Sequence, residues 1–217
     1  MNSMLRLEVD NIGKRFGRRV LFRRLSFGLE GGDALAVTGP NGSGKSTLLK
    51  ILGGVLRPTA GSVTLLRQGQ ALSGEAHPLN VGFVSPYINV YEDLSARENL
   101  AFLANARRLS ERHKKVEEAL ELVALSARAN DLVRDYSSGM KQRMKFAAAL
   151  LASPPLLLLD EPLTNLDADG CDLAGRIVEH QRTMKGIVVV ATNAPEEVAA
   201  YERVLRIEQP VGDRLGP

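Results

Sequence analysis

The sequence predicts an α/β fold with a parallel sheet that is buried on both faces, and three observations support this prediction. The runs 156–159 and 187–191 are entirely apolar and have the length of buried strands. A Gly-rich loop at 39–47 stands between a predicted strand and a predicted helix. Apolar residues at helical spacing dominate the segment that lies between the N-terminal part and these two strands. We therefore expect a single domain over 1–217, with an α/β core at 1–91 and 153–217 and an inserted α-helical lobe at 92–152.

The N-terminal part is predicted to be mostly β-strand. Leu5, Leu7 and Val9 alternate with polar residues, which is typical of a strand with one buried face. The segments that follow are short, rich in apolar residues and separated by Gly or Asn. We expect an antiparallel β subdomain at the N-terminus that leads into the core. Strands are predicted at 5–9, 20–29, 33–38, 62–66 and 81–84, and a helix at 45–52.

Helices are predicted from residue 94 onward. Ser95, followed three residues later by Glu98, is the pattern of a capping box at a helix start. Helical spacing continues at 116–123 and 144–151, before the strand at 156–159 returns the chain to the core. The remaining elements are predicted as a helix at 168–184 and strands at 187–191 and 203–208.

Composition excludes several classes of protein. The net charge of +3 is too small to indicate a nucleic-acid partner, so none is expected. Cys171 is the only cysteine, which rules out a disulfide framework and a thiolate metal site. The most apolar region, 147–159, is interrupted at 153–155 and is too short to cross a membrane. None of the histidines (His77, His113 and His180) falls in a motif, and we expect all of them at the surface.

The loop at 39–47 has the sequence of a complete phosphate-binding loop. Its backbone N–H groups can surround a β-phosphate, Lys45 can reach the β- and γ-phosphates, and the Ser46 hydroxyl can ligate Mg²⁺. A loop between a strand and a helix also directs the helix N-terminus at the phosphates. The predicted nucleotide-binding residues of the loop are Gly39, Pro40, Asn41, Gly42, Ser43, Gly44, Lys45, Ser46 and Thr47.

Two further segments carry candidate chemistry. Asp160 ends an all-leucine strand, where it can hold Mg²⁺ through water, and Glu161 follows where a bend would direct it at a water near the γ-phosphate. The alternative is an acidic pair at a helix entry before Pro162. Ser137, Ser138 and Gly139 can form a second anion-binding site at a helix N-terminus, although the same residues also make an ordinary helix cap.

In this order and combination, the motifs resemble those of the nucleotide-binding domain of ATP-binding cassette (ABC) transporters over nearly the whole chain. The resemblance implies a P-loop NTPase core of the RecA-like type, ATP and Mg²⁺ as ligands, and Glu161 as the catalytic residue. It also implies that Phe16 stacks on adenine, for which the alternative is a phenylalanine in a turn or in the core. The matching segments are 39–47 (Walker A), 136–140 (signature), 156–161 (Walker B) and 164–167 (D-loop, with Asp167).

The resemblance further implies that two cassettes pair head to tail, so that Ser137, Ser138 and Gly139 act on the ATP of the other chain. The second cassette would be another copy or a related chain. A separate membrane permease would complete the transporter, and the chain would lie peripherally at the cytoplasmic face of the membrane. The permease is expected to dock near 86–94, where 91–94 match the family pattern.

Two positions depart from the family pattern. Pro86 stands where the family has a glutamine, and it offers no side-chain oxygen to a metal. Asn193 occupies the position of the switch histidine, and it can donate a hydrogen bond but cannot carry a proton. We therefore expect intact ATP binding and slower or differently gated hydrolysis.

The preferred function is an ATPase subunit that drives export. One alternative is an ABC ATPase that does not transport, although the insertions and tandem cassettes typical of that class are absent from the sequence. Another is a clamp that binds ATP and hydrolyses little, and Glu161 argues against it because a clamp needs no general base. The short C-terminal part favours exporters of the multidrug and polysaccharide type or the haem exporter of cytochrome c maturation.

Overall fold

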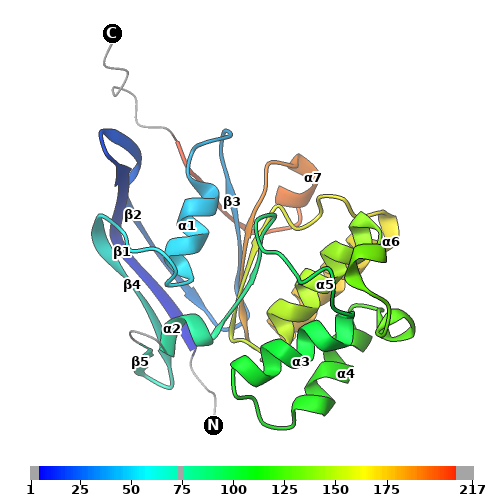
Figure 1. Cartoon of the computed structure of the whole chain (residues 1–217). Coiled ribbons are helices and arrows are strands. Elements are labelled where there is room, and N and C mark those ends of the chain that lie inside the picture. The colour runs from blue at the N-terminus through cyan, green and yellow to red at the C-terminus, as the bar shows by residue number, and fades with distance from the viewer. Residues whose placement is uncertain (1–4, 73–75, 209–217) are drawn as a thin grey trace.

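The fold consists of two sheets and a group of helices, as seen in a computed structural model that describes residues 5–72 and 76–208 (Figure 1). An antiparallel sheet has the strand order β2-β1-β4-β5, and a parallel sheet has the order β6-β7-β8-β3-β9. The predicted α/β class is confirmed. The antiparallel strands are β1 (Leu5–Phe16), β2 (Arg19–Glu30), β4 (Ala60–Arg67) and β5 (Gln70–Leu72). The parallel strands are β3 (Ala34–Thr38), β6 (Val81–Val84), β7 (Leu156–Asp160), β8 (Ile187–Ala191) and β9 (Arg203–Arg206).

The β1–β2 hairpin has one buried face, as the alternation in the sequence predicts. Leu5, Leu7 and Val9 are all buried, whereas Arg6 is exposed. The pairing register shifts after Val9, next to Asn11, which adopts a left-handed backbone with φ of 48°. Such a bulge bends the hairpin and lets the sheet wrap over the core.

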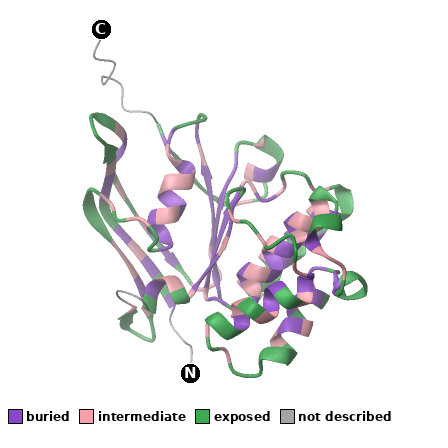
Figure 2. Ribbon diagram, in the orientation of Figure 1, coloured by how far each residue is buried: buried purple, intermediate pink, exposed green. Residues whose placement is uncertain are grey.

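The parallel sheet is covered on both sides, which explains its uninterrupted apolar strands. Every residue of β7 and β8 is buried (Figure 2). Because neighbouring side chains on a strand point to opposite faces, Leu156 and Leu158 pack toward the antiparallel sheet, while Leu157 and Leu159 pack toward the helical lobe. In Figure 1, α1 lies between the two sheets and the other large helices lie beyond the parallel sheet. The longer helices are α1 (Lys45–Leu52), α3 (Ala96–Ala106), α4 (Arg112–Leu122), α5 (Ser138–Leu150) and α6 (Ala168–Thr183).

The helical segment contains more breaks than the sequence predicts. The capping box is present: Ser95 caps α3 by accepting from Glu98 N, and the Glu98 carboxylate accepts from Ser95 N at 2.8 Å. The chain then turns between α3 and α4, where Arg108 and Glu111 have φ of 52° and 50°. The helix predicted at 144–151 begins earlier, at Ser138. Short elements that the sequence did not indicate are α2 (Ala76–Leu79), α7 (Pro195–Val198) and the 3₁₀ turns Ser126–Arg128 and Val133–Asp135.

One expectation about the histidines is wrong. His77 is buried rather than at the surface, and its Nε2 lies 2.7 Å from the carbonyl oxygen of Leu52. That carbonyl belongs to the last turn of α1, which needs an external partner, and the imidazole provides it. The domain boundaries at 91/92 and 152/153 stay a prediction. Among the described residues, none of the helices combines the length and the apolar composition needed to cross a bilayer.

The register of the parallel sheet brings three chain segments to one edge. Val37 of β3 and Asp160 of β7 both pair with Ala191 of β8. Because the strands are parallel, the loops that follow all three leave from the same edge. These loops contain the phosphate-binding sequence, Glu161 and Asn193.

Candidate nucleotide-binding and hydrolysis site

The phosphate-binding loop connects β3 to α1 and depends on glycine. Gly39 has φ of 147°, and a Cβ atom there would lie 2.4 Å from the carbonyl oxygen of Ile207. Gly44 caps α1 with φ of 106° and no side-chain cap, and the first turn of the helix contains no acidic residue. The N–H groups of this turn therefore remain available for an anion, as the sequence predicts.

The polar side chains of the loop are arranged around the space that it encloses. Lys45 Nζ donates to the carbonyl oxygen of Gly39 at 2.9 Å, so the lysine folds back across the loop. Ser43 Oγ is buried and has no hydrogen-bond partner among the described residues. An unpaired buried hydroxyl is costly, and an added phosphate oxygen would satisfy it. The loop thus presents unsatisfied donors to an anionic ligand.

Ser46 and Asp160 meet beside the loop. Ser46 Oγ donates to Asp160 Oδ1 at 3.0 Å, and Asp160 is only 1% exposed. The second oxygen, Asp160 Oδ2, is buried without a hydrogen-bond partner among the described residues. Burial raises the pKa of this carboxyl, and the Ser46 hydroxyl and the charges of Lys50 and Lys45 oppose that rise. A hydroxyl and a carboxylate with a free oxygen fit a hard cation such as Mg²⁺.

Glu161 follows Asp160 at a sharp bend, as predicted. Its φ is 50°, an uncommon backbone conformation for a residue other than glycine, and its N–H donates to the carbonyl oxygen of Ala191 at 2.9 Å. Burial raises the pKa of the Glu161 carboxyl, Lys45 opposes this, and the charge of Asp160 adds to it. A raised pKa brings the carboxylate closer to the value that suits a general base near neutral pH.

The switch position lies against the phosphate loop. Asn193 Nδ2 donates to Asn41 Oδ1 at 2.8 Å, and both side chains are exposed. The Asn193 amide therefore lies against the phosphate-binding loop. This contact joins the segment after β8 to the segment after β3.

The segment after β6 does not provide a glutamine, but it still approaches Asp160. Pro86 is exposed, whereas Ser85 is buried and its hydroxyl lowers the pKa of Asp160. Lys145 Nζ donates to the carbonyl oxygens of Ser85 and Pro86 at 3.4 and 3.3 Å. Sequence reasoning missed Ser85 and Lys145. The sequence offered one signal for Ser85, namely its position at the carboxyl end of a predicted strand.

The signature residues lie at the start of α5. Ser137 is the N-cap and its Oγ accepts from Met140 N at 3.2 Å, which is the ordinary cap considered above. Ser137 and Ser138 are nevertheless exposed. Tyr136 is buried and its hydroxyl donates to the carbonyl oxygen of Arg128 at 2.6 Å, which holds the start of the helix in place. No hydrogen bond within the described part of the chain joins Ser137–Gly139 to the phosphate loop.

Asp167 caps the next helix. Its Oδ1 accepts from Gly170 N at 2.9 Å and lies 3.6 Å from Arg143 Nη2 of α5. The carboxylate itself stays largely exposed. The loop at 164–167 and the signature helix are therefore connected within one chain.

Phe16 lies at the tip of the β1–β2 hairpin and is 52% exposed, so it is not a core residue. Lys14 Nζ lies 4.9 Å from the centre of its ring. The hairpin is joined to the phosphate loop by Arg19, whose Nη2 donates to the carbonyl oxygen of Gly42 at 3.0 Å. Arg19 was not singled out in the sequence, because its role depends on the hairpin folding against the loop.

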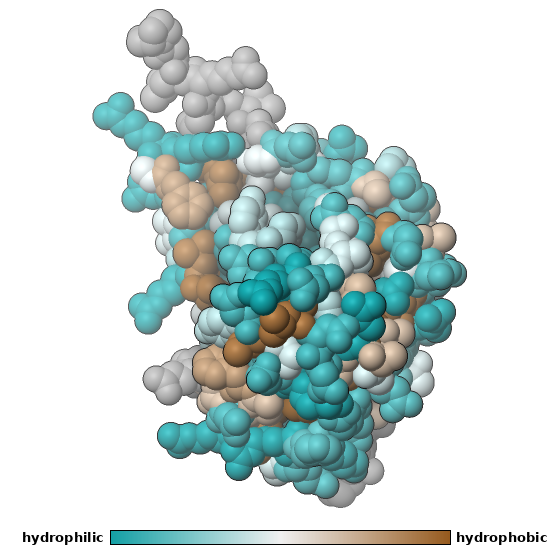
Figure 3. Space-filling view, turned by 45° about the vertical axis from the view of Figure 1, so that its right-hand side comes forward, coloured by the Kyte–Doolittle hydropathy of each residue, from teal (hydrophilic) through white to brown (hydrophobic). Residues whose placement is uncertain are grey.

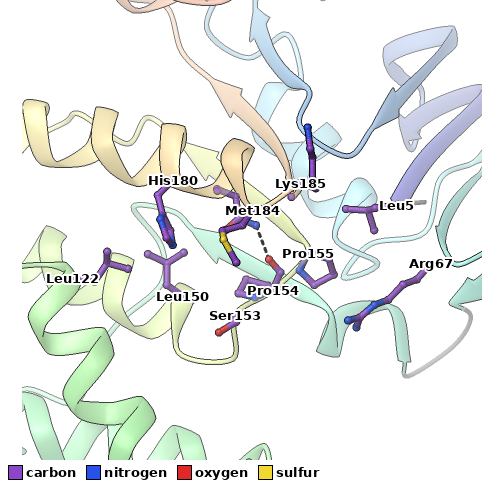
Figure 4. A pocket seen from close by; sticks show the side chains of 12 residues that line it. Leu5, Arg67, Leu122, Leu150, Ser153, Pro154, Pro155, His180, Met184 and Lys185 are labelled. Atoms are coloured by element: carbon purple, nitrogen blue, oxygen red, sulfur yellow. Dashed lines mark hydrogen bonds between the residues drawn. The ribbon is translucent and has the colours of Figure 1, made fainter. Parts of the chain in front are cut away.

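A separate cavity of about 270 Å³ lies at the opposite edge of the sheet (Figure 4). Its lining includes Pro154 and Pro155 before β7 and Gly186 before β8, at the amino ends of the strands. Gln181 Nε2 donates to the carbonyl oxygen of Pro154 at 2.6 Å beneath it. None of the predicted site residues lines this cavity.

Comparison with known proteins identifies the family of the chain. The family model described as "ABC transporter" matches residues 22–164. The cytochrome c biogenesis ATP-binding export protein CcmA of Rhodospirillum rubrum is 40% identical over 82% of this chain and 75% of its own length. The linearmycin resistance ATP-binding protein LnrL of Bacillus subtilis is 32% identical over 88% of this chain, which spans 62% of that relative.

A solved structure of the dimeric ATP-binding cassette MJ0796, in a post-hydrolysis state bound to ADP and Pi, superimposes with a TM-score of 0.80. The two chains are 26% identical, and the alignment covers 94% of each. The P-loop NTPase fold is thereby confirmed. Since the matched segment 22–164 includes the phosphate loop, the signature and the carboxylate pair, the chain belongs to the ABC transporter family.

Proposed function

We propose that this chain is the ATP-hydrolysing subunit of an exporter and acts through a separate membrane permease. The observation that carries the proposal is the contact of Ser46 with Asp160 at 3.0 Å beside the phosphate loop, with Glu161 bent out of the strand immediately afterward. This arrangement supports triphosphate binding, a cation site and a general base at one edge of the sheet. A module that only binds nucleotide has no need of the base.

Each of these residues has a defined part in hydrolysis. The loop N–H groups and Lys45 bind the phosphates and stabilise charge on the γ-phosphate. Ser46 and Asp160 would hold Mg²⁺, which supplies charge neutralisation at the β- and γ-phosphates when it is bound. Glu161 accepts a proton from the attacking water, and Asn193 orients the γ-phosphate by donating one hydrogen bond. Phe16 stacks on the adenine ring.

Two cassettes are needed to complete the site. Ser137 and Ser138 are exposed at a helix N-terminus and have no hydrogen bond to their own phosphate loop, so they are available to a second chain. The dimeric state of the similar MJ0796 cassette supports such a pairing. The partner is a second copy or a related cassette, which would place each ATP between one chain's phosphate loop and the other chain's signature.

Export and a peripheral position at the membrane are inferred from the relatives. CcmA is named as an export protein, and the Nod factor export ATP-binding protein I of Rhizobium leguminosarum bv. viciae is 34% identical over 76% of this chain. The chain would bind the cytoplasmic face of a permease and supply it with the free energy of ATP hydrolysis. Pro86 and Asn193 would make hydrolysis slower than in a cassette with glutamine and histidine at those positions.

Phosphate release by the chain in complex with its permease tests this proposal. Glu161→Gln should lower the rate by at least about 100-fold, the contribution expected of a general base, while ATP binding is retained. The exposed Glu202 offers a matched control, because Glu202→Gln removes an equivalent charge outside the site. Equal rates in the wild type and in Glu161→Gln would refute the assigned base. Formation of an ATP-bound dimer without phosphate release would favour the clamp instead.

A further inference from the structure

A polar hollow lies between the helix α5 and the segment that follows β6. It has a volume of about 450 Å³, and Val90 is its one apolar lining residue in the described part of the chain. In Figure 3, where the side of the molecule with the helices comes forward, most of the visible surface is hydrophilic. Lys141 and Lys145 of α5 both line the hollow, and Lys141 donates to the Glu92 carboxylate on its other side at 2.7 Å. Because the lining is polar, lysine contacts rather than apolar packing join the two sides.

Lys145 differs from Lys141 because it contacts backbone instead of a carboxylate. Its Nζ donates to the carbonyl oxygens of Ser85 and Pro86 at 3.4 and 3.3 Å, and it has no ion pair among the described residues. Lysines ordinarily extend the charged end of the side chain into water. Burial lowers the pKa of the Lys145 ammonium, so this group has given up part of its hydration. The two carbonyl dipoles replace that hydration and direct the charge at one point of the backbone.

The backbone that this ammonium contacts belongs to a residue beside Asp160. Val84 of β6 pairs with Leu159 of β7, so the residues that follow them, Ser85 and Asp160, are neighbours across the two strands. Ser85 is 1% exposed, and its hydroxyl interacts with the Asp160 carboxylate. Because Ser85 Oγ accepts from Tyr87 N at 3.4 Å, the hydroxyl proton is available to the carboxylate. The Ser85 hydroxyl can therefore fix the orientation of the Asp160 side chain.

The helix that carries Lys145 is a firm base for such a contact. α5 is continuous from Ser138 to Leu150, and Lys145 lies about two turns, roughly 10 Å, after Ser138. Its neighbours Met144 and Phe146 are both buried in the core. The backbone of Lys145 is therefore held by packing, and only the side chain has to be ordered to reach the segment after β6.

We propose that Lys145 is a positioning residue for ATP hydrolysis, which holds Ser85 so that the Ser85 hydroxyl fixes the Asp160 carboxylate. The inference rests on the proposed function, since it concerns the rate of hydrolysis. Pro86 assists, because a proline restricts the backbone of the residue before it. The ammonium and the proline ring together favour one conformation of Ser85. The contact also joins the helix that begins at the signature to the strand end beside Asp160.

Steady-state phosphate release by the chain in complex with its permease gives the first test. Lys145→Met should lower kcat by about 10-fold or more, the loss expected for one hydrogen bond to a charged group, with KM and ATP binding unchanged. Lys145→Arg keeps the charge and the donors and should restore most of the rate. Lys114→Met removes an exposed lysine of α4 and should leave kcat unchanged. An unchanged kcat in Lys145→Met would overturn the proposal.

A double-mutant cycle tests whether Lys145 acts through Ser85. Ser85→Ala should also lower kcat by about 10-fold, because the same hydroxyl is lost. Adding Lys145→Met to Ser85→Ala should cause little further loss, since the group that the lysine positions is already absent. Independent effects would instead multiply to about 100-fold. That multiplication would overturn the proposal, because Lys145 would then act by another route.

Hydrogen exchange on the whole chain measures the position of Ser85 without reference to activity. The Tyr87 N–H donates to Ser85 Oγ, and the Ile88 N–H donates to the carbonyl oxygen of Ser85 at 3.1 Å. Both amides should exchange faster in Lys145→Met and at the wild-type rate in Lys145→Arg. Lys145→Gln provides the same comparison if circular dichroism shows that Lys145→Met is unfolded. Unchanged exchange at both amides would overturn the proposal, whereas a wild type that releases no phosphate would refute the proposed function instead.

Discussion

Gly39 provides the sharpest test of how the phosphate loop is built. In Gly39→Ala, the new Cβ would lie 2.4 Å from the carbonyl oxygen of Ile207 and 3.0 Å from Ser43 Oγ. The backbone at Ile207 cannot easily move away, because its N–H donates to the carbonyl oxygen of Thr38 at 2.8 Å and the residue is fully buried. The substitution therefore combines a steric clash with a backbone conformation that alanine rarely adopts.

The expected loss follows from these two contributions. Forcing an extra methyl group into a packed site costs about 1–3 kcal/mol. A backbone in the positive-φ region costs an L-residue about 1–2 kcal/mol more. The free energy of unfolding should therefore fall by about 2–5 kcal/mol, a large part of the ~5–15 kcal/mol that is typical of a domain. ATP affinity should fall with it, because the first residue of the loop is displaced.

Gly69→Ala is the matched control. Gly69 has φ of 76°, but a Cβ atom there would have no heavy atom within 4 Å. Only the backbone contribution of about 1–2 kcal/mol applies, and the entropic effect on the unfolded chain is the same in both variants. Urea denaturation monitored by circular dichroism gives the two free energies, and a fluorescent ATP analogue gives binding. Equal losses in the two variants, or intact ATP binding by a destabilised Gly39→Ala, would refute the steric argument.

Three further predictions concern the switch position, the core and a helix cap. Asn193→Ala should change the free energy of unfolding by less than about 0.5 kcal/mol. The same variant should slow single-turnover phosphate release by about 10-fold or more, because one hydrogen bond to a charged group is lost. Asn193→His should not slow phosphate release. Leu158→Ala removes a fully buried side chain of β7 and should cost about 2–5 kcal/mol in urea denaturation, whereas the exposed Leu79→Ala should cost less than about 0.5 kcal/mol. The backbone N–H and hydroxyl of Ser95 lower the pKa of Glu98 below its ordinary 4.5, so the carboxylate contributes stability above pH 4.5 that is lost as the pH falls through the lowered value. Glu98→Gln should therefore destabilise the protein at pH 7 and lose its effect in acid; a constant effect across this range of pH would contradict the cap.

The sequence predicted the site more completely than it predicted the lobe. The buried strand predicted at 156–159, the loop at 39–47 and the bend at Glu161 all follow from local patterns, because an apolar run, a Gly-rich turn and a strand end each have one main structural solution. The α4 region is different. Its sequence is strongly polar, and the turn before it uses Arg108 and Glu111 in a left-handed conformation that neither residue type indicates.

Residues that act through distant contacts were missed. Arg19 contacts Gly42, and Lys145 contacts Ser85 and Pro86, across 23 and about 60 positions of sequence. His77 was expected at the surface because nothing near it in the sequence indicates that it closes the end of α1. Such roles depend on tertiary packing rather than on local pattern, and a single sequence contains no direct record of them.

The strand order has a consequence for how the segments of the candidate site are coupled to one another. β7, which ends in Asp160 and leads to Glu161, lies directly between β6 and β8. β6 leads to Ser85 and β8 leads to Asn193, while the Glu161 N–H donates to the carbonyl oxygen of Ala191, the last residue of β8. The ends of β6 and β7 are therefore only one strand spacing apart, about 4.8 Å. A shift of one of these strand ends would move its neighbour directly through the ladder of backbone hydrogen bonds, without a relay of side chains through the core.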